Sequence, residues 1–348
     1  MAFSDKLEAW YNDNGRTLPW RGIDDPYRIW LSEIILQQTR IEQGRDYWLR
    51  FVEAFPTVAD LAAASEEQVL RLWQGLGYYS RARNLHAAAQ YIMNNCGGIF
   101  PATYEEILKL KGVGRYTAAA IASFAYRLPH PVIDGNVYRF ISRLRGISTP
   151  VATDAAYTEF ESLLKTLIDP VRPDRFNAAL MDFGSLQCHP APDCRTCPFA
   201  DECVARLTGR VGLLPVKAPK TKPTDRWFYY IDLRWQGQIA MHLRTARDIW
   251  RGLWELPLME ADHELDNDEL VSQASRFVKE GFLLDIPSFR LSTTRTHQLT
   301  HRTIHALFLQ AETAAPPPAM PENTRPVPLG EIKNIPVSRL IDKYLQGM

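Results

Sequence analysis

The chain has 348 residues, of which 46% are hydrophobic and 23% charged, and its formal net charge is zero. This length and composition predict a globular protein with room for two domains, each able to bury a core of its own. No run of 18 apolar residues is present and the first residues lack the apolar segment of a signal peptide, so we expect a cytoplasmic protein without a membrane partner.

The positive charge is concentrated in two stretches of the chain. Residues 71–145 carry ten Lys and Arg against three acids, and residues 204–226 carry six against one. A local basic face is what phosphate binding requires, whatever the total charge of the chain. Ordinary solvated charge gives the same count, so the pattern permits nucleic-acid binding without establishing it.

A strongly helical segment is predicted from Tyr27 to Arg40, directly after Pro26. Its one acid, Glu33, lies among apolar neighbours such as Trp30. Partial burial there would raise the pKa of the carboxyl group and keep it protonated. A structural Glu on the solvent side of the helix is the alternative.

The next informative stretch is a Gly-Leu-Gly break at residues 75–77, followed by Tyr78, Tyr79, Arg81 and Arg83. Exposed tyrosines beside arginines suit stacking on bases combined with phosphate contact. Tyrosines buried in the core are the alternative, and the pattern alone does not decide between the two.

Residues 110–136 contain a turn that can bind an anion. A segment with helical apolar spacing ends at Gly112-Val113-Gly114, and a second helix begins at once with Arg115. Two glycines let the backbone approach a ligand closely, and the N-terminus of the new helix adds the positive end of its dipole. A helix–helix turn whose glycines serve geometry alone is the alternative.

Residues 150–186 are predicted to be helical and carry no site, but a cluster of cysteines follows them directly. In a cytoplasmic chain four close cysteines indicate a metal site more often than a set of disulfides. A zinc ribbon and an iron–sulfur cluster with all-thiolate ligands both fit the set. Its members are Cys188, Cys194, Cys197 and Cys203. Cys96 stands apart, and we expect it to be a buried structural thiol.

The last third of the chain has a different pattern. Residues 204–224 are basic and rich in proline, and are predicted to form a semi-rigid linker. Beyond them, strands are predicted at 226–234, 238–243 and 304–310, with a helix near 269–278. This order predicts a small α/β or α+β domain.

Several of these stretches together resemble the adenine DNA glycosylase (MutY) family, within the helix-hairpin-helix/Gly-Pro-Asp DNA glycosylase superfamily. The resemblance is carried by residues 18–21 (Leu-Pro-Trp-Arg), 30–39 (Trp-Leu-Ser-Glu-Ile-Ile-Leu-Gln-Gln-Thr), 72–85 and 110–136. It implies a multidomain fold. An all-α helix-hairpin-helix glycosylase domain with an iron–sulfur cluster loop is expected over residues 1–203. The linker at 204–224 and an α+β Nudix-like domain over 225–348 complete it.

The resemblance also implies roles for individual residues. It makes Glu33 the acid that protonates adenine and Asp134 the oxocarbenium stabiliser or transient nucleophile, with Tyr116 and Asn136 holding the site. Contacts with DNA are implied for Gln37, Gln38, Tyr78, Arg81, Gly112, Gly114 and Arg115. Because Tyr116 stands where lyase-competent relatives have Lys, we expect a monofunctional glycosylase. Lys111 stands where relatives usually have Pro.

The resemblance favours a 4Fe–4S cluster over zinc, although the first gap between the cysteines is one residue shorter than in relatives. Residues 249–257 resemble the start of the Nudix signature. Residues 258–270 contain acids but not the Arg-Glu-x-x-Glu-Glu array that holds the metal, so hydrolase chemistry is not expected. The family loop that reads 8-oxoguanine is matched by His297, Leu299, Thr300 and His301. In this loop Leu replaces Phe and Thr replaces Ser.

The expected function is base excision repair of double-stranded DNA, with removal of flipped adenine paired with 8-oxoguanine or guanine by a monomeric, nucleoid-associated enzyme. A thymine-mismatch or pyrimidine-damage glycosylase is disfavoured by the C-terminal domain and by Tyr116. A non-catalytic damage-binding or scaffold protein is disfavoured by the retention of Glu33 and Asp134. A nucleotide-pool hydrolase lacks the acidic array it would need.

Overall fold

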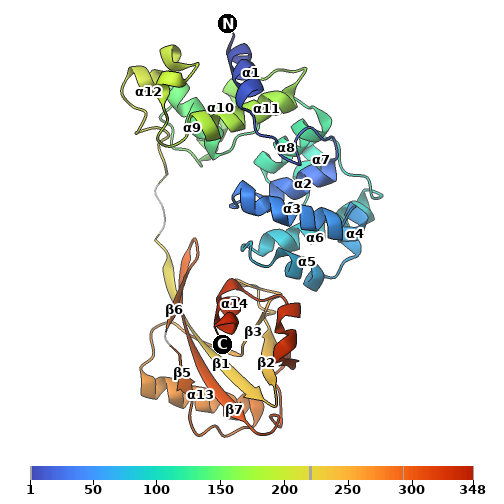
Figure 1. Cartoon of the computed structure of the whole chain (residues 1–348), viewed down its shortest axis with the longest axis vertical. Coiled ribbons are helices and arrows are strands. Elements are labelled where there is room, and N and C mark those ends of the chain that lie inside the picture. The colour runs from blue at the N-terminus through green and yellow to red at the C-terminus, as the bar shows by residue number, and fades with distance from the viewer. Residues whose placement is uncertain (1, 219–221, 293, 348) are drawn as a thin grey trace. The chain divides into compact units, whose positions relative to one another are not determined.

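The computed structural model describes residues 2–218, 222–292 and 294–347 (Figure 1). Two compact units are formed, one by Met1–Ala63 with Asn84–Pro219 and the other by Ala64–Arg83 with Lys220–Met348. Residues 219–221 of the expected linker lie outside the described residues. Among the described residues, no helix combines the length and the apolar character needed to cross a bilayer.

The first unit is helical, as predicted. Its elements are α1 (Phe3–Asn14), α2 (Pro26–Ile35), α3 (Ile41–Ala54), α4 (Val58–Ala63), the greater part of α6 (Ser80–Asn95), α7 (Tyr104–Leu108), α8 (Arg115–Tyr126), α9 (Gly135–Arg145), α10 (Asp154–Lys165), α11 (Pro173–Asp182), the π-helical turn η1 (Phe183–Gln187), the 3₁₀ turns η2 (Cys194–Thr196) and η3 (Ala200–Glu202), and α12 (Val204–Leu207).

One core of the first unit joins α1, α9, α10 and α11 through buried side chains such as Phe140, Phe160 and Phe183. Three of the four clustered cysteines pack against this core. The segment after α12 also belongs to the unit, because Leu214 is 3% exposed and its carbonyl accepts a hydrogen bond of 3.0 Å from Arg143 Nε. The expected linker therefore begins with packed residues.

Helix α2 is shorter than predicted. It ends at Ile35, whereas the apolar spacing predicted a helix up to Arg40. The chain turns instead, with a hydrogen bond from the Thr39 amide to the Leu36 carbonyl and with Gln38 at a φ of +59°. A non-glycine residue in this left-handed region costs free energy, and such residues gather at functional sites.

The second unit contains α5 (Glu66–Trp73), β1 (Thr224–Trp235), β2 (Gln238–Leu243), β3 (Trp254–Glu255), β4 (Leu258–Ala261), α13 (Asn267–Phe282), β5 (Arg290–Leu291), β6 (Arg295–Gln298), β7 (Arg302–Thr313), β8 (Thr324–Pro328), the 3₁₀ helix η4 (Leu329–Asn334) and α14 (Arg339–Gln346). The strands and the helix predicted from the sequence are all present, and the α+β class is confirmed.

These strands form one mixed sheet of the order β3-β2-β1-β7-β5, with β4 beside β1, β6 beside β7 and β8 beside β2. Only the pairing of β1 with β7 is parallel among the described strand pairs. Alternate residues of β1 serve opposite faces. Tyr229 and Ile231 pack with α13, whereas Tyr230 stacks on Phe308, which stacks on Tyr344 of α14. A helix thus covers each face (Figure 1).

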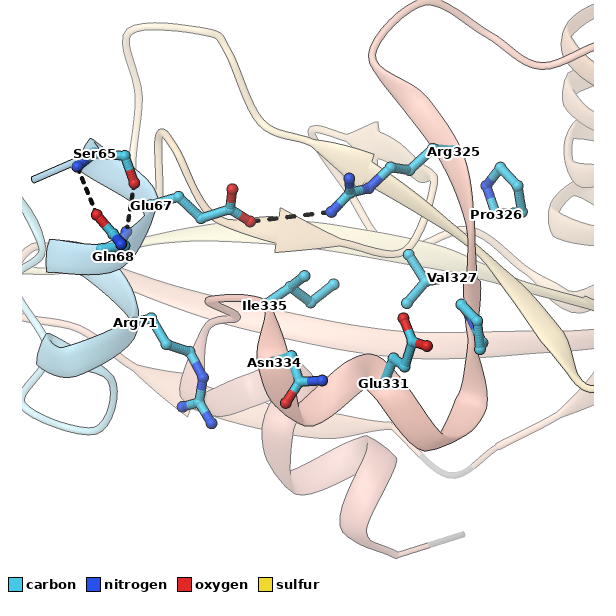
Figure 2. A pocket seen from close by; sticks show the side chains of 11 residues that line it. Ser65, Glu67, Gln68, Arg71, Arg325, Pro326, Val327, Glu331, Asn334 and Ile335 are labelled. Carbon is cyan, nitrogen blue, oxygen red and sulfur yellow. Dashed lines mark hydrogen bonds and ion pairs between the residues drawn. The ribbon is translucent and has the colours of Figure 1, made fainter.

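Residues 64–83 join the second unit through contacts with its C-terminal part. Trp254 Nε1 donates to Glu67 at 3.2 Å, and the Tyr79 hydroxyl donates to the Val337 carbonyl at 3.2 Å. Glu67 also lies 4.0 Å from Arg325 across an open hollow of about 440 Å³ between α5 and β8 (Figure 2). The polar groups that line this hollow cap and anchor α5, so we assign the hollow a structural role.

Candidate functional site

Glu33 is a buried titratable group of the first unit. It lies on α2 with 6% of its surface exposed, although it is an acid. Burial raises its pKa to about 7, while a hydrogen bond from the Tyr116 hydroxyl and the charge of Arg21 oppose the shift. The charge of Asp134 adds to the rise. The burial predicted for this carboxyl group is confirmed, and the solvent-facing alternative is wrong.

Asp134 is held rigidly at the N-terminus of α9. Its carboxylate accepts hydrogen bonds from the amides of Asn136 and Val137 at 2.8 and 2.7 Å, and from Asn136 Nδ2 at 2.8 Å. Burial raises the pKa of Asp134, and these hydrogen bonds oppose the rise because they favour the charged form. The structure brings Asp134, Asn136, Tyr116 and Glu33 together, as the sequence predicted.

Two further side chains support Asp134 and were not found from the sequence. The Oδ1 atom of Asn177 accepts from the Val132 amide at 3.0 Å, and its Nδ2 donates to Ser123 Oγ and the His130 carbonyl. Arg139 donates to Asn136 Oδ1 at 2.8 Å and to the Cys188 carbonyl at 2.8 Å. Each of these residues is one polar residue within a helix. Neither belongs to a sequence motif that would have indicated its role.

Asp182 is a second buried acid, with no exposed surface, and lies on α11 where no site was predicted. It accepts from Arg16 Nε at 3.0 Å and from the Arg16 amide at 2.9 Å, and lies 3.4 Å from Arg21. Since Arg21 also acts on the pKa of Glu33, this buried ion pair fixes a positive charge close to the acid. In the sequence, the Leu-Pro-Trp-Arg motif indicated that Arg21 belongs to a site. No motif indicated a role for Asp182.

The turn before α8 has the geometry of an anion site. Gly112 has a φ of +80°, and a Cβ there would lie 2.7 Å from the Asn84 Cβ, so this position requires glycine. Gly114 caps α8 with no side-chain hydrogen bond, and a Cβ there would meet nothing within 4 Å. Gly114 thus leaves the start of α8 without a side-chain cap, and the first amides of a helix are the groups that bind an anion.

Other side chains predicted to contact DNA gather near the start of α8. Gln37 Nε2 donates to Thr117 Oγ1 at 3.3 Å, and Gln38 is exposed. Arg115 is half-exposed, pairs with Asp154 at 2.5 Å and lies over the Tyr157 ring. Both glutamines and the turn before α8 thus belong to one region of the first unit.

The four cysteines line one cavity, together with apolar side chains such as Phe140 and Phe199. Arg143 Nη1 donates to Cys188 Sγ at 3.6 Å, and Cys203 Sγ donates to the Arg143 carbonyl at 3.4 Å. In the described part of the chain, no three His, Cys, Asp or Glu side chains are grouped to hold a single metal ion. Cys96, expected to be buried, is half-buried.

In the second unit, Tyr78 and Tyr79 have different roles. Tyr78 is 51% exposed at a φ of +47°, and its hydroxyl lies 2.6 Å from Thr300 Oγ1. Tyr79 belongs to the core. Arg81 is also buried, donates to the carbonyls of Leu76 and Gly77, and therefore supports the turn that presents Tyr78. It has no solvent-facing guanidinium for the DNA contact that the sequence suggested.

A hollow of about 580 Å³ in the second unit brings the predicted reader loop together with Tyr78. Its lining includes His297, Leu299, Thr300 and His301. His297 packs edge-on against Trp250, at 5.7 Å between ring centroids. Burial and two nearby cations lower the pKa of His297, so its ring is neutral near pH 7.

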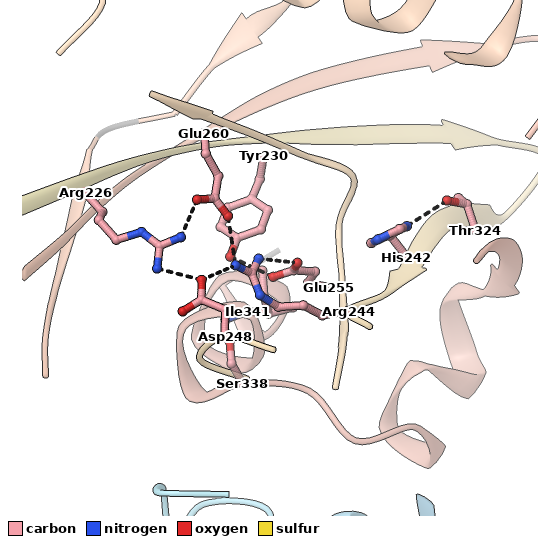
Figure 3. A network of polar contacts seen from close by, with 10 residues as sticks. All are labelled: Arg226, Tyr230, His242, Arg244, Asp248, Glu255, Glu260, Thr324, Ser338 and Ile341. Atoms are coloured by element: carbon pink, nitrogen blue, oxygen red, sulfur yellow. Dashed lines mark hydrogen bonds and ion pairs between the residues drawn. The ribbon is translucent and has the colours of Figure 1, made fainter. Parts of the chain in front are cut away.

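Three acids of the second unit are engaged by arginines (Figure 3). Arg244 contacts Glu255 and Glu260 at 2.8 Å and Asp248 at 2.9 Å. Arg226 pairs with Asp248 at 2.7 Å. Arg226 and Arg244 thus compensate the charge of these carboxylates inside the unit.

Two family models match the chain, one in its helical N-terminal part and one in its C-terminal part. The family model described as HhH-GPD superfamily base excision DNA repair protein matches residues 31–167. The NUDIX domain model matches residues 229–347. The structure of a thermostable thymine-DNA glycosylase superimposes with a TM-score of 0.56 at 28% identity, covering 59% of this chain and 95% of that one. A non-covalent endonuclease III–DNA complex, at 22% identity and a TM-score of 0.52, shows the same fold.

Curated relatives narrow the family further. The adenine DNA glycosylase of Buchnera aphidicola subsp. Baizongia pistaciae (strain Bp) is 35% identical over 269 residues, covering 74% of this chain and 74% of the relative. That of Homo sapiens is 40% identical over 215 residues, covering 59% of this chain and 39% of the longer relative. The chain therefore belongs to the adenine DNA glycosylase family of base excision DNA repair enzymes.

Proposed function

We propose that this protein is a monofunctional, monomeric and nucleoid-associated glycosylase that removes adenine paired with 8-oxoguanine or guanine in double-stranded DNA. The observation that carries the proposal is the pair of buried carboxyl groups. Glu33, with a pKa raised to about 7, serves as acid, and Asp134 serves as the anion. Three hydrogen bonds favour the charged form of Asp134, whereas burial favours the protonated form of Glu33, so the two carboxyl groups are suited to different roles.

The proposed reaction breaks the bond between adenine and its deoxyribose. Glu33 gives its proton to the adenine ring, so that the base leaves without negative charge. The sugar then acquires oxocarbenium character, which the negative charge of Asp134 stabilises until a water molecule adds to C1′ and loses a proton, leaving the abasic sugar. The three hydrogen bonds to Asp134 fix that charge in place before the reaction begins, so little reorganisation is required.

Tyr116 explains why the enzyme should cleave only the base. A lyase needs an amine that attacks the sugar carbon, and the phenol of Tyr116 cannot form a Schiff base. Its hydroxyl donates to Glu33 instead, and burial raises its pKa well above the usual value, so the phenol keeps its proton. We therefore expect little strand cleavage after base release.

A base inside the duplex cannot reach Glu33, so the adenine must leave the stack. The amides at the start of α8, between Gly114 and Tyr116, would hold a phosphate of the distorted strand. Gln37 and Gln38 would enter the stack, since Gln38 is exposed on the turn that ends α2. The strained backbone of Gln38 is consistent with this role.

In the second unit, the exposed ring of Tyr78 offers a stacking surface for a base. The hydroxyl of Thr300 and the neutral ring of His297 offer hydrogen bonds that could distinguish 8-oxoguanine from guanine. Leu299 supplies an apolar wedge where relatives have Phe. The hollow that these side chains share supports assigning the opposite base to this unit.

The cysteine set fits a 4Fe–4S cluster, with Cys188, Cys194, Cys197 and Cys203 as ligands. A bound cluster would tie the segment after η1 into a fixed loop. Arg139 and Arg143 reach from α9 to the carbonyl and thiol of Cys188, so this chain's own hydrogen bonds connect that loop to the helix capped by Asp134. Iron and sulfide content, compared with zinc, tests the assignment.

Single-turnover excision tests the proposed function. Three duplexes are needed, with adenine opposite 8-oxoguanine, adenine opposite guanine, and thymine opposite guanine. Adenine should be released from the first two, faster from the first, without alkali-independent strand cleavage. The duplex with thymine opposite guanine is included because a thymine-DNA glycosylase has a related fold. Release of thymine without release of adenine would overturn the proposal.

A further inference from the structure

The hollow of the second unit carries more positive charge than base reading requires. Three guanidinium groups contribute to its lining, those of Arg83, Arg302 and Arg339. The carboxylate in that lining, Asp248, is ion-paired at 2.7 and 2.9 Å with the two arginines of the network in Figure 3. Its charge is therefore compensated inside the unit, and the hollow presents a net positive face.

Two of the three arginines are not used by the fold. Arg83 donates to the Arg251 carbonyl at 2.6 Å and holds that loop. Arg302 and Arg339 are exposed, and in the part of the chain that the structure describes neither forms an ion pair. The neighbouring arginines of the network each contact two or more acids. Unpaired cations that line one hollow indicate an anionic ligand from outside the chain.

The positions of Arg302 and Arg339 relate this charge to the reader loop. Arg302 is the first residue of β7 and follows His301 directly; its carbonyl accepts from the Leu299 amide at 2.8 Å. Arg339 is the first residue of α14 and is close enough to His297 to lower the pKa of that ring. The two guanidinium groups thus lie near the two ends of the loop 297–301.

We propose that Arg302 and Arg339 bind backbone phosphates of the DNA strand whose base the loop 297–301 reads. This inference rests on the proposed function, because it takes DNA as the ligand of the hollow. A planar guanidinium matches the oxygens of a phosphate with two parallel hydrogen bonds. Contacts on either side of the read base would set the register of the strand, so that the base meets Tyr78 and Thr300.

A phosphate contact has a measurable signature that differs from base reading. It strengthens binding to all duplexes alike, and each phosphate neutralised contributes a slope of about −0.9 to the dependence of log K on log salt. Loss of base reading would instead lower affinity for the 8-oxoguanine duplex alone. The two roles are therefore separable in one titration series.

The experiment measures dissociation constants of the full chain over a range of NaCl concentrations. The duplexes carry 2′-fluoro-2′-deoxyadenosine opposite 8-oxoguanine or guanine, since the fluorine disfavours the oxocarbenium ion and prevents turnover; a fully paired duplex is the third. The variants are Arg302→Gln, Arg339→Gln, both together, and the corresponding Lys variants. Both positions are exposed, and thermal unfolding checks that the variants fold.

Arg290→Gln is the matched control. Arg290 is an exposed arginine on β5 whose register partner, Gln310, lies eight residues along β7 from Arg302, which is roughly 25 Å. The double Gln variant should have a salt slope about 1 to 2 smaller in magnitude on all three duplexes. The Lys variants should restore the slope, and Arg290→Gln should not change it.

An unchanged slope in the double Gln variant would overturn the phosphate assignment, and so would a loss confined to the 8-oxoguanine duplex. The assignment of the loop 297–301 as the reader of 8-oxoguanine is judged separately. Its measure is the ratio of the dissociation constants of the unaltered protein for the two mispaired duplexes. If that ratio is one, the 8-oxoguanine proposal fails while the slope still decides whether these arginines bind phosphate.

Discussion

At the scale of single residues, the chemistry depends on one buried acid. Replacing Glu33 by Gln keeps the shape of the side chain and removes the proton donor. We expect adenine excision to slow by about 10²- to 10⁴-fold while duplex affinity stays within a few-fold. Single-turnover excision and equilibrium binding measure the two effects. Glu42→Gln, at an exposed position of α3, is the control, and near-normal excision by Glu33→Gln would remove this residue from the mechanism.

The raised pKa of Glu33 also predicts a pH dependence. The acid must be protonated to act, so the excision rate should fall as pH rises through about 7, by tenfold per pH unit above it. Asp134 must be ionised, and its pKa is raised as well, so a second decline is expected on the acid side. A rate that stays constant from pH 7 to pH 9 would exclude Glu33 as the acid.

At the scale of elements, the turn before α8 offers a matched pair of glycines. Gly112→Ala places a Cβ 2.7 Å from the Asn84 Cβ at a φ of +80°, and should lower the free energy of unfolding by about 1–3 kcal/mol. Gly114→Ala meets open space, so stability should change by less than about 0.5 kcal/mol. A methyl group in this open space should obstruct a phosphate bound at the turn, and so weaken duplex binding. Denaturant unfolding and binding titrations test the pair, and normal binding by Gly114→Ala would place the phosphate elsewhere.

The elements also show what the sequence could reveal. The aromatic-rich, strand-like sequence of 226–234 predicted β1, short strand-like stretches predicted β2 and β7, and the apolar neighbours of Glu33 predicted its burial. The end of α2 was missed because the spacing of apolar residues continues beyond Ile35, whereas Gln38 adopts a left-handed conformation. Asp182 and Asn177 were missed because their roles come from partners more than 40 residues away, which no local pattern encodes.

At the scale of the whole molecule, one hydrogen bond joins residues 222 positions apart, from Tyr78 to Thr300. If the pair presents the reader loop as a unit, Tyr78→Phe and Thr300→Ala should each reduce the preference for 8-oxoguanine over guanine by several-fold. The double variant should lose little more than either single one, because both remove the same bond. Excision rates on the two mispaired duplexes give the coupling, and strictly additive losses would show that the two hydroxyls act independently.

The grouping of Ala64–Arg83 with Lys220–Met348 has a consequence for synthesis of the protein. The apolar side chains of α5, such as Leu70 and Trp73, leave the ribosome long before the strands and helices that complete their unit. Closing a loop of that length is slow, and apolar surface that waits for its partner is prone to aggregation. Release of the finished chain, rather than completion of the first unit, should therefore be the moment at which a nascent molecule becomes resistant to proteases around residue 70.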